Sequence, residues 1–115
     1  MSIVYFQLSR GTPFLLFDAD GAAAPVNSQI IGVPPWVENI AWRTKFSAAP
    51  VSCDIRLQGA LTISDPPVDA DFGDLDSSTN VNGEGRQLSP LKLRYIRARK
   101  NAQVGVANLT VEIMG

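Results

Sequence analysis

The stretch "VENIAWRTKF" (residues 37–46) decides the fold class, because its side chains alternate strictly in character. An extended chain places on one face Ile40, Trp42, Thr44 and Phe46, and on the other face Ala41, Arg43 and Lys45. Strands have a period of two residues, so this pattern is typical of a strand with one buried and one wet face. It indicates an antiparallel sheet packed on one side.

The same period recurs along the chain. In "SCDIRLQGAL" (52–61) the inward set is Cys53, Ile55, Leu57, Gly59 and Leu61, and in "NLTVEIMG" (108–115) it is Leu109, Val111 and Ile113. Proline- and glycine-rich turns separate such runs. The sequence therefore predicts strands near 3–9, 13–18, 28–33, 38–47, 51–63, 70–75, 90–99 and 103–114.

About eight short strands in one domain of 115 residues favour an all-β fold. We expect residues 1–115 to form a single antiparallel β-sandwich that is jelly-roll-like, with a closed barrel as the alternative. The chain is long enough to bury a core without disulfides or metal. Its one cysteine, Cys53, lies in an apolar alternating run and is expected to be a buried thiol.

The amino-acid composition limits the classes of function that this chain can have. The formal net charge is −1, and the chain contains no histidine. A Ser-His-Asp or Cys-His centre is thereby excluded, and a zinc site is disfavoured. We expect no enzyme, no cofactor, no nucleic acid partner and no membrane association, since no segment approaches the length of a bilayer span and no signal-peptide pattern opens the chain.

Five of the ten basic residues lie in "LKLRYIRARK" (91–100). Unbroken alternation after Leu91, Leu93 and Tyr95 would turn Arg97 and Arg99 into the core, which is costly without partners. We therefore predict a bulge between Tyr95 and Ile96, or a strand that leaves the edge of the core at Tyr95. Arg97 and Arg99 are expected near solvent or a loop, with at least one paired to a carboxylate. The rival reading is a phosphate-binding stripe made of Lys92, Arg94, Arg97, Arg99 and Lys100.

An acidic segment precedes that strand, in "SDPPVDADFGDLDSS" (64–78). Carboxylate oxygens are the ligands that Ca²⁺ prefers, which makes Asp69, Asp71 and Asp76 an alternative calcium site. The spacing departs from that of the EF-hand loop, because Gly73 comes one place early and no glutamate follows at the twelfth position. The main expectation is no metal, with the aspartates balancing the basic strand.

Two apolar features suggest contacts with other molecules. The N-terminal "MSIVYFQL" is apolar at almost every position, which suits a strand covered on both faces, so it is expected to contact a neighbouring subunit. Trp36 follows two prolines at a loop-to-strand junction, where it could anchor a sugar ring or a protein, or could instead cap one end of the sandwich. The predicted interface is formed by Ile3, Val4, Tyr5, Phe6 and Trp36.

The order "IRLQGAL…DFGDLDSS…LSPLKLRYIRAR…LTVEIMG" resembles a pattern in small virion proteins of tailed bacteriophages, over roughly residues 51–115. The "RYIRA" element, Arg94 to Ala98, is intact, and it is also similar to a strand of discoidin-like carbohydrate-binding sandwiches. Ala60 replaces the usual small polar residue, and "TISDPP" replaces the usual Asp-Gly hairpin.

The resemblance implies a jelly-roll-like capsid decoration (cement) or head-fibre protein, made in the host cytoplasm and placed on the phage head. Its implied partner is the major capsid protein, and a homo-oligomer is implied, with a trimer favoured. The alternative is a carbohydrate-binding or tail-associated module for host attachment.

Overall fold

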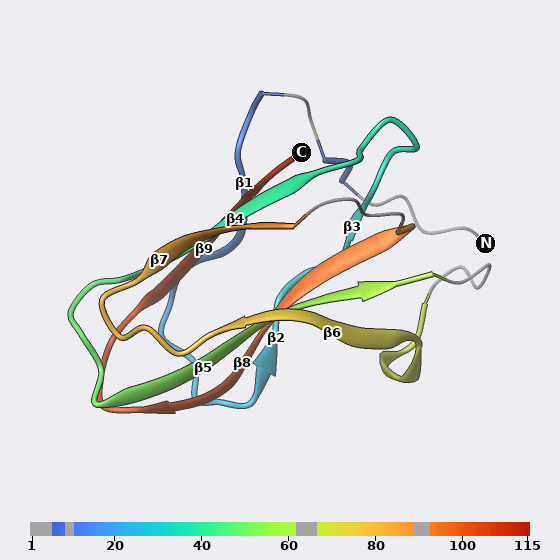
Figure 1. The fold of residues 1–115 in the computed structure, drawn as a ribbon. Coiled ribbons are helices and arrows are strands. Elements are labelled where there is room, and N and C mark those ends of the chain that lie inside the picture. Colours follow the sequence, from blue (N-terminus) through green and yellow to red (C-terminus); the bar gives the residue numbers. More distant parts are fainter. Residues whose placement is uncertain (1–5, 9–10, 62–66, 89–92) are drawn as a thin grey trace.

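The protein is an all-β sandwich in the computed structural model, which describes residues 6–8, 11–61, 67–88 and 93–115 (Figure 1). The strands are β1 (Phe14–Asp20), β2 (Val26–Asn27), β3 (Ile31–Gly32), β4 (Ile40–Phe46), β5 (Ser52–Ala60), β6 (Phe72–Ser78), β7 (Glu84–Leu88), β8 (Tyr95–Val104) and β9 (Leu109–Met114), with one 3₁₀ turn, η1 (Asp69–Asp71). None of the helical segments in the described part has the length and apolar character to cross a bilayer.

The strands form two antiparallel sheets, in the orders β1-β9-β4-β7 and β2-β8-β5-β6, and β3 also pairs with β8. Counting β2 and β3 as one interrupted strand, the pairs nest: β5 with β6, β4 with β7, β2/β3 with β8, and β1 with β9. A long hairpin rolled up in this way is a jelly roll. The predicted antiparallel, jelly-roll-like sandwich of about eight strands is confirmed.

The core lies between the sheets and is filled by the residues that the alternation places inward. Trp42 is buried on β4, Ile55 and Leu57 on β5, and Leu109, Val111 and Ile113 on β9. Cys53 is buried as expected, and burial raises the pKa of its thiol. Leu61 is an exception, because β5 ends at Ala60 and the Leu61 side chain is 79% exposed.

The predicted bulge between Tyr95 and Ile96 is wrong. Strand β8 pairs with β5 without interruption from Tyr95 to Lys100, and the register shift comes later, between Lys100 and Ala102. Ile96 and Ala98 face the core, so Tyr95 and Arg97 lie on the opposite face of the sheet, where both are nevertheless buried. Tyr95 already lies on the outer face of the sheet. Regular alternation from Tyr95 therefore places Arg97 on the outer face as well, and no bulge is needed to keep it out of the core.

Strand boundaries differ from expectation at several further places, among them β2, which precedes the predicted strand 28–33, and β6, which runs on to Ser78. Strand β7 lies where a loop is predicted, because "EGRQL" contains no apolar alternation. Strand β8 runs on to Val104, so the turn before β9 comes at residues 105–108. Of the predicted first strand, only residues 6–8 are described, and Gln7 forms a parallel bridge with Gly32.

Candidate functional site

Arg97, in the basic strand, is enclosed by partners from its own chain. Its Nη1 donates to Asp69 Oδ1 at 2.8 Å, and its Nε donates to Gln58 Oε1 at 2.9 Å. The guanidinium also lies 4.1 Å from the centre of the Phe72 ring, in cation–π contact. The η1 turn and the start of β6 thus cover Arg97, and the predicted pairing of at least one of the two arginines with a carboxylate is confirmed by Asp69.

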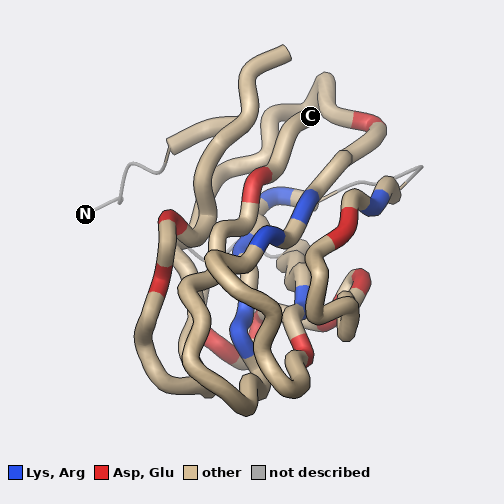
Figure 2. Tube along the Cα trace, turned by 90° about the vertical axis from the view of Figure 1, so that its left-hand side faces the viewer, with Lys and Arg blue, Asp and Glu red and all other residues tan. Residues whose placement is uncertain are grey.

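The rest of this sheet face continues as a polar ladder. Arg56 bridges Asp54 and Asp74, at 3.0 and 2.7 Å. The Gln58 amide donates to Asp74, and Asn101 donates to Asp54. Figure 2 shows how basic and acidic positions are distributed over the chain trace.

Arg99 ends near this ladder without a carboxylate partner among the described residues. Its Nη1 donates to Asn27 Oδ1 at 3.0 Å, and its Nε donates to Asn101 Oδ1 at 3.1 Å. Lys92 lies outside the described residues. Arg97, Arg99 and Lys100 of the basic stretch are therefore bonded within the chain, which leaves little free charge on these three cations for phosphate groups.

Two acidic members of the ladder, Asp54 and Asp69, are held in their charged form. The hydrogen bond from Arg56 lowers the pKa of Asp54, and the hydrogen bond from Arg97 lowers the pKa of Asp69. A nearby cation favours the carboxylate over the carboxylic acid. These aspartates are poor proton donors or acceptors near neutral pH.

The three aspartates of the alternative calcium site do not converge. Asp69 pairs with Arg97, Asp71 Oδ2 accepts the backbone N–H of Val68 at 2.8 Å, and Asp76 bonds to the other sheet. In the part of the chain that the structure describes, no group of three acidic or cysteine side chains could hold a metal ion.

Asp76 joins the two sheets at one open side of the sandwich. Its Oδ2 accepts the indole N–H of Trp42 at 3.0 Å and the Nε–H of Arg86 at 2.7 Å. Glu84 accepts the hydroxyl of Ser78 at 2.6 Å and lies 3.5 Å from Arg86. Burial raises the pKa of Asp76, but the bonds from Arg86, Trp42 and the Ser77 amide outweigh it and hold the pKa below its usual value.

Lys100 closes the opposite side of the sandwich. Its side chain is 1% exposed, yet it is fully partnered, because Nζ lies 2.8 Å from Asp20 Oδ2 and donates to the carbonyls of Asp20 and Ala22. These contacts tie β8 of one sheet to the end of β1 in the other. Lys100 is therefore a structural cation.

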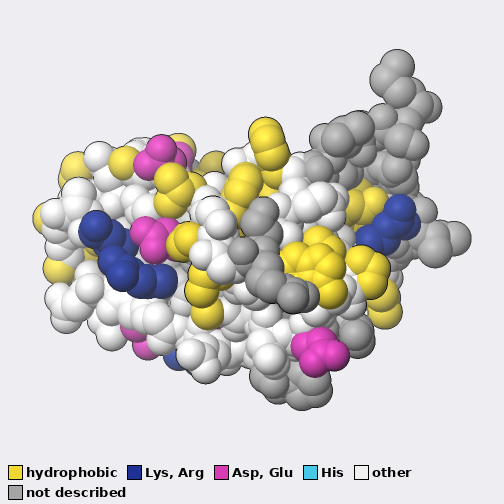
Figure 3. Space-filling view, turned by 90° about the horizontal axis from the view of Figure 1, so that it is seen from above, with side chains coloured by type: hydrophobic (Ala, Val, Ile, Leu, Met, Phe, Trp, Pro, Cys, Tyr) yellow, Lys and Arg dark blue, Asp and Glu magenta, His cyan; other side chains and the backbone are white. Residues whose placement is uncertain are grey.

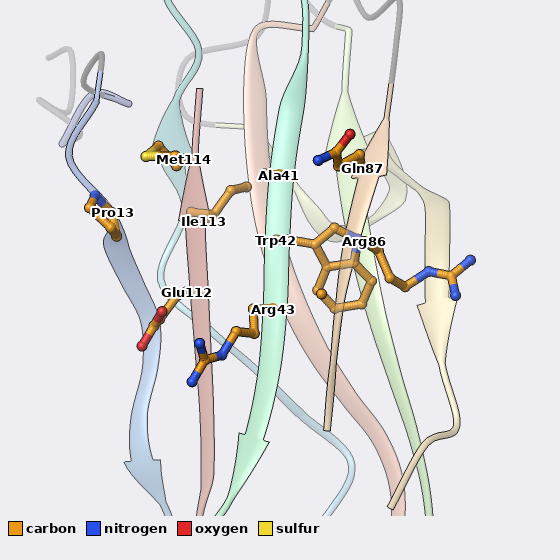
Figure 4. Close-up of a pocket in the computed structure, with 10 residues that line it drawn as sticks. Pro13, Ala41, Trp42, Arg43, Arg86, Gln87, Glu112, Ile113 and Met114 are labelled. Carbon is orange, nitrogen blue, oxygen red and sulfur yellow. The ribbon is translucent and has the colours of Figure 1, made fainter. Parts of the chain in front are cut away.

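The outer face of the four-stranded sheet is a different kind of surface. It carries a shallow concavity of about 450 Å³, whose lining includes Ala41, Arg43, Gly85, Gln87, Glu112 and Met114 (Figure 4). A second depression shares Ala41, Gln87 and Met114 and continues to Asn39. Seen from above, this side of the molecule shows broad uncharged areas with a few charged groups among them (Figure 3).

The predicted interface residues are only partly described. Ile3, Val4 and Tyr5 lie outside the described residues. Phe6 is 68% exposed, and its ring centre lies 5.7 Å from that of Phe14. Trp36 is 40% exposed and lines a small recess with Glu38 and Asn39.

Two loops, 47–51 and 105–108, form a second apolar surface that the sequence analysis does not identify. Val51, Val104 and Val106 are 78%, 57% and 100% exposed. The Val51 amide donates to the Val104 carbonyl at 2.7 Å, so the three valines form one tip. No charged residue occurs in 47–52 or 104–108, and that run of uncharged turn residues is the sequence signal for this tip.

The comparisons with known proteins bear on the fold. No family model matches the chain, and no curated protein matches it. Among solved structures, the chain is similar to the SPBc2 prophage-derived protein YomS, with a TM-score of 0.56 and 16% identity, over 89% of this chain and 90% of that chain. At this identity the likeness shows a shared sandwich architecture.

Proposed function

We propose that the protein is a non-enzymatic structural component of a phage virion, and specifically a decoration protein that stabilises the head by binding across capsid subunits. The observation that carries this proposal is the division of the surface. Most charged side chains of the five-stranded sheet are bonded within the chain, while the tip carries only uncharged groups and the outer face of the four-stranded sheet carries few charged ones. Interfaces of low charge are typical of stable assembly contacts.

Two further points support the proposal. The motifs of residues 51–115 resemble those of small virion proteins, and the structurally similar YomS is described as prophage-derived. The absence of histidine removes the commonest general acid–base group.

The mechanism follows from apolar burial. The tip formed by Val51, Val104 and Val106 presents a neutral knob whose two loops are bonded to each other, so little order has to be gained on binding. Phe6 and Trp36 offer exposed aromatic surface elsewhere. We propose that such surfaces fill recesses between major capsid protein subunits.

Binding to shells of the encoding phage tests this role. The wild-type chain should co-sediment with heads that lack it. Val106→Asp should lose binding while remaining folded, because a carboxylate cannot be buried cheaply in a dry recess. Thr79→Asp, in the β6–β7 connection, is the matched control and should bind normally. Equal binding by both variants would contradict a role for the tip.

A carbohydrate-binding attachment module is the second candidate, favoured by the half-exposed Trp36 beside Asn39 and Glu38. Indole rings stack on sugar faces, and amide and carboxylate groups bond to hydroxyls. Binding to a glycan panel that is lost in Trp36→Ala would favour this module over the decoration role.

A further inference from the structure

The outward-facing residues of the four-stranded sheet are arranged symmetrically about the midline of the sheet. The sheet order β1-β9-β4-β7 has its midline between β9 and β4. Across one row of the register lie Leu15, Glu112, Arg43 and Gly85. Across the neighbouring outward row, Met114 lies beside Ala41. On either side of the midline, Leu15 is thus matched by Gly85, Met114 by Ala41, and the cation Arg43 by the anion Glu112.

We propose that two copies of the chain pack face to face through this surface, about a two-fold axis that runs parallel to the strands between β4 and β9. Such a rotation places β9 of one copy over β4 of the other, and β1 over β7. Residues of one row stay in that row, so the contact is self-complementary, as an isologous interface must be. This inference does not depend on the proposed place in a virion.

The first match in this arrangement is one of charge. Arg43 of each copy faces Glu112 of the other, so two ion pairs form across the axis. Within one chain these two residues are register partners, yet no ion pair joins them, and neither forms one with any other described residue. Figure 4 shows both side chains on this face. Their charges are thus available to a second copy.

The second match is one of shape. Leu15, 40% exposed, faces the bare backbone at Gly85, and Met114 faces Ala41. Gly85 and Ala41 line the concavity of about 450 Å³, so the partner's side chains have space to enter. Aligned sheets pack about 10 Å apart and cross at about 30°, which keeps the strands nearest the axis in closest register.

Edge-to-edge pairing is a poorer route to association. Strand β7 is five residues long and points Glu84 and Arg86 inward, where they bond to Ser78 and Asp76. Strand β1 carries two register shifts. Short edges, inward charges and bulges all oppose the addition of another strand. The sheet face, rather than its edges, is therefore the surface for a second copy.

Substitution at Gly85 tests the contact without disturbing the fold. A Cβ at Gly85 meets no atom within 4 Å, and the same is true of Gly73 in the other sheet. By light scattering, the wild type should have twice the 12.4 kDa mass of one chain. Gly85→Leu should be monomeric and Gly73→Leu dimeric, with circular dichroism unchanged in both. A monomeric or trimeric wild type, or a dimer that Gly85→Leu leaves intact, overturns the proposal.

Charge reversal tests the pairing itself. Arg43→Glu and Glu112→Arg should each weaken dimerisation about tenfold or more, because like charges then face each other across the axis. The double variant Arg43→Glu/Glu112→Arg should restore it. Additive weakening in the double variant would show that these residues do not pair between copies. A dimer absent from virions would refute only the decoration role.

Discussion

At the residue scale, the molecule is held by polar side chains that reach from one sheet to the other. Trp42 is 2% exposed, and its indole N–H has its partner, Asp76, on the opposite sheet. On the opposite side of the sandwich, Lys100 likewise joins the two sheets by its ion pair with Asp20. A buried N–H donor that loses its acceptor is still removed from water, so the fold loses the full free energy of its desolvation. Each of these carboxylates is therefore expected to contribute substantially to the free energy of unfolding.

Asp76→Ala should therefore destabilise the fold by about 1–3 kcal/mol, because it leaves the Trp42 N–H without its acceptor. Urea denaturation measures the change, and Thr79→Ala, in the exposed β6–β7 connection, is the control. A loss no larger than the control's would show that water replaces the carboxylate without penalty.

Arg97→Ala should cost about 1–3 kcal/mol in the same assay, since it removes the bonds to Asp69 and Gln58 and the contact with Phe72. Arg43→Ala, on the exposed outer face, should change the stability of the monomer little. If the two variants were equally stable, the contacts of Arg97 with Asp69, Gln58 and Phe72 would not stabilise the fold.

Stability should also fall in acid. The pKa values of Asp54, Asp69 and Asp76 lie below 3.8 in the folded chain. Groups with lowered pKa values contribute stability above their unfolded pKa and lose it as the pH falls through the folded value. Melting temperatures from neutral pH to about pH 2.5 should drop mainly below pH 4, and less steeply in Asp76→Asn. A flat profile in the wild type would contradict these pairings.

The core residues of β4, β5 and β9 are predictable from the sequence because packing enforces their alternation. The directions of Arg97 and Lys100 are not, since their partners Asp69 and Asp20 are far away in sequence. Alternation identifies a face but not what covers it. Here η1 covers the outer face at Arg97, which makes a buried arginine possible outside the core.

At the element scale, β7 shows why an edge strand escapes prediction. Its inward residues include Glu84 and Arg86, whose charges are satisfied by β6 and by each other. A prediction based on the alternation of apolar and polar residues assigns such a strand to a loop. The face of the four-stranded sheet is equally invisible to sequence reasoning, because Leu15, Glu112, Arg43 and Gly85 form a row only once the register is known.

The connection from β6 to β7 depends on Gly83. This glycine has φ +80°, and a Cβ there would lie 2.5 Å from the Thr44 carbonyl oxygen. Gly83→Ala should cost about 1–3 kcal/mol, because the backbone must shift or remain strained. Gly73→Ala, in open space, is the control in thermal unfolding. Equal melting temperatures would show that the turn adapts freely.

At the scale of the whole molecule, the jelly roll bonds most charged side chains of the five-stranded sheet within the chain, leaves an uncharged tip, and carries Arg43 and Glu112 on the outer face of the other sheet. The central claim is that these surfaces serve assembly in a phage head. Mass spectrometry of purified heads, separated from tails of the encoding phage, tests it most directly. The account predicts this chain in the head fraction, in a fixed ratio to the major capsid protein. Its presence in tails alone, or its absence from particles, would contradict the account.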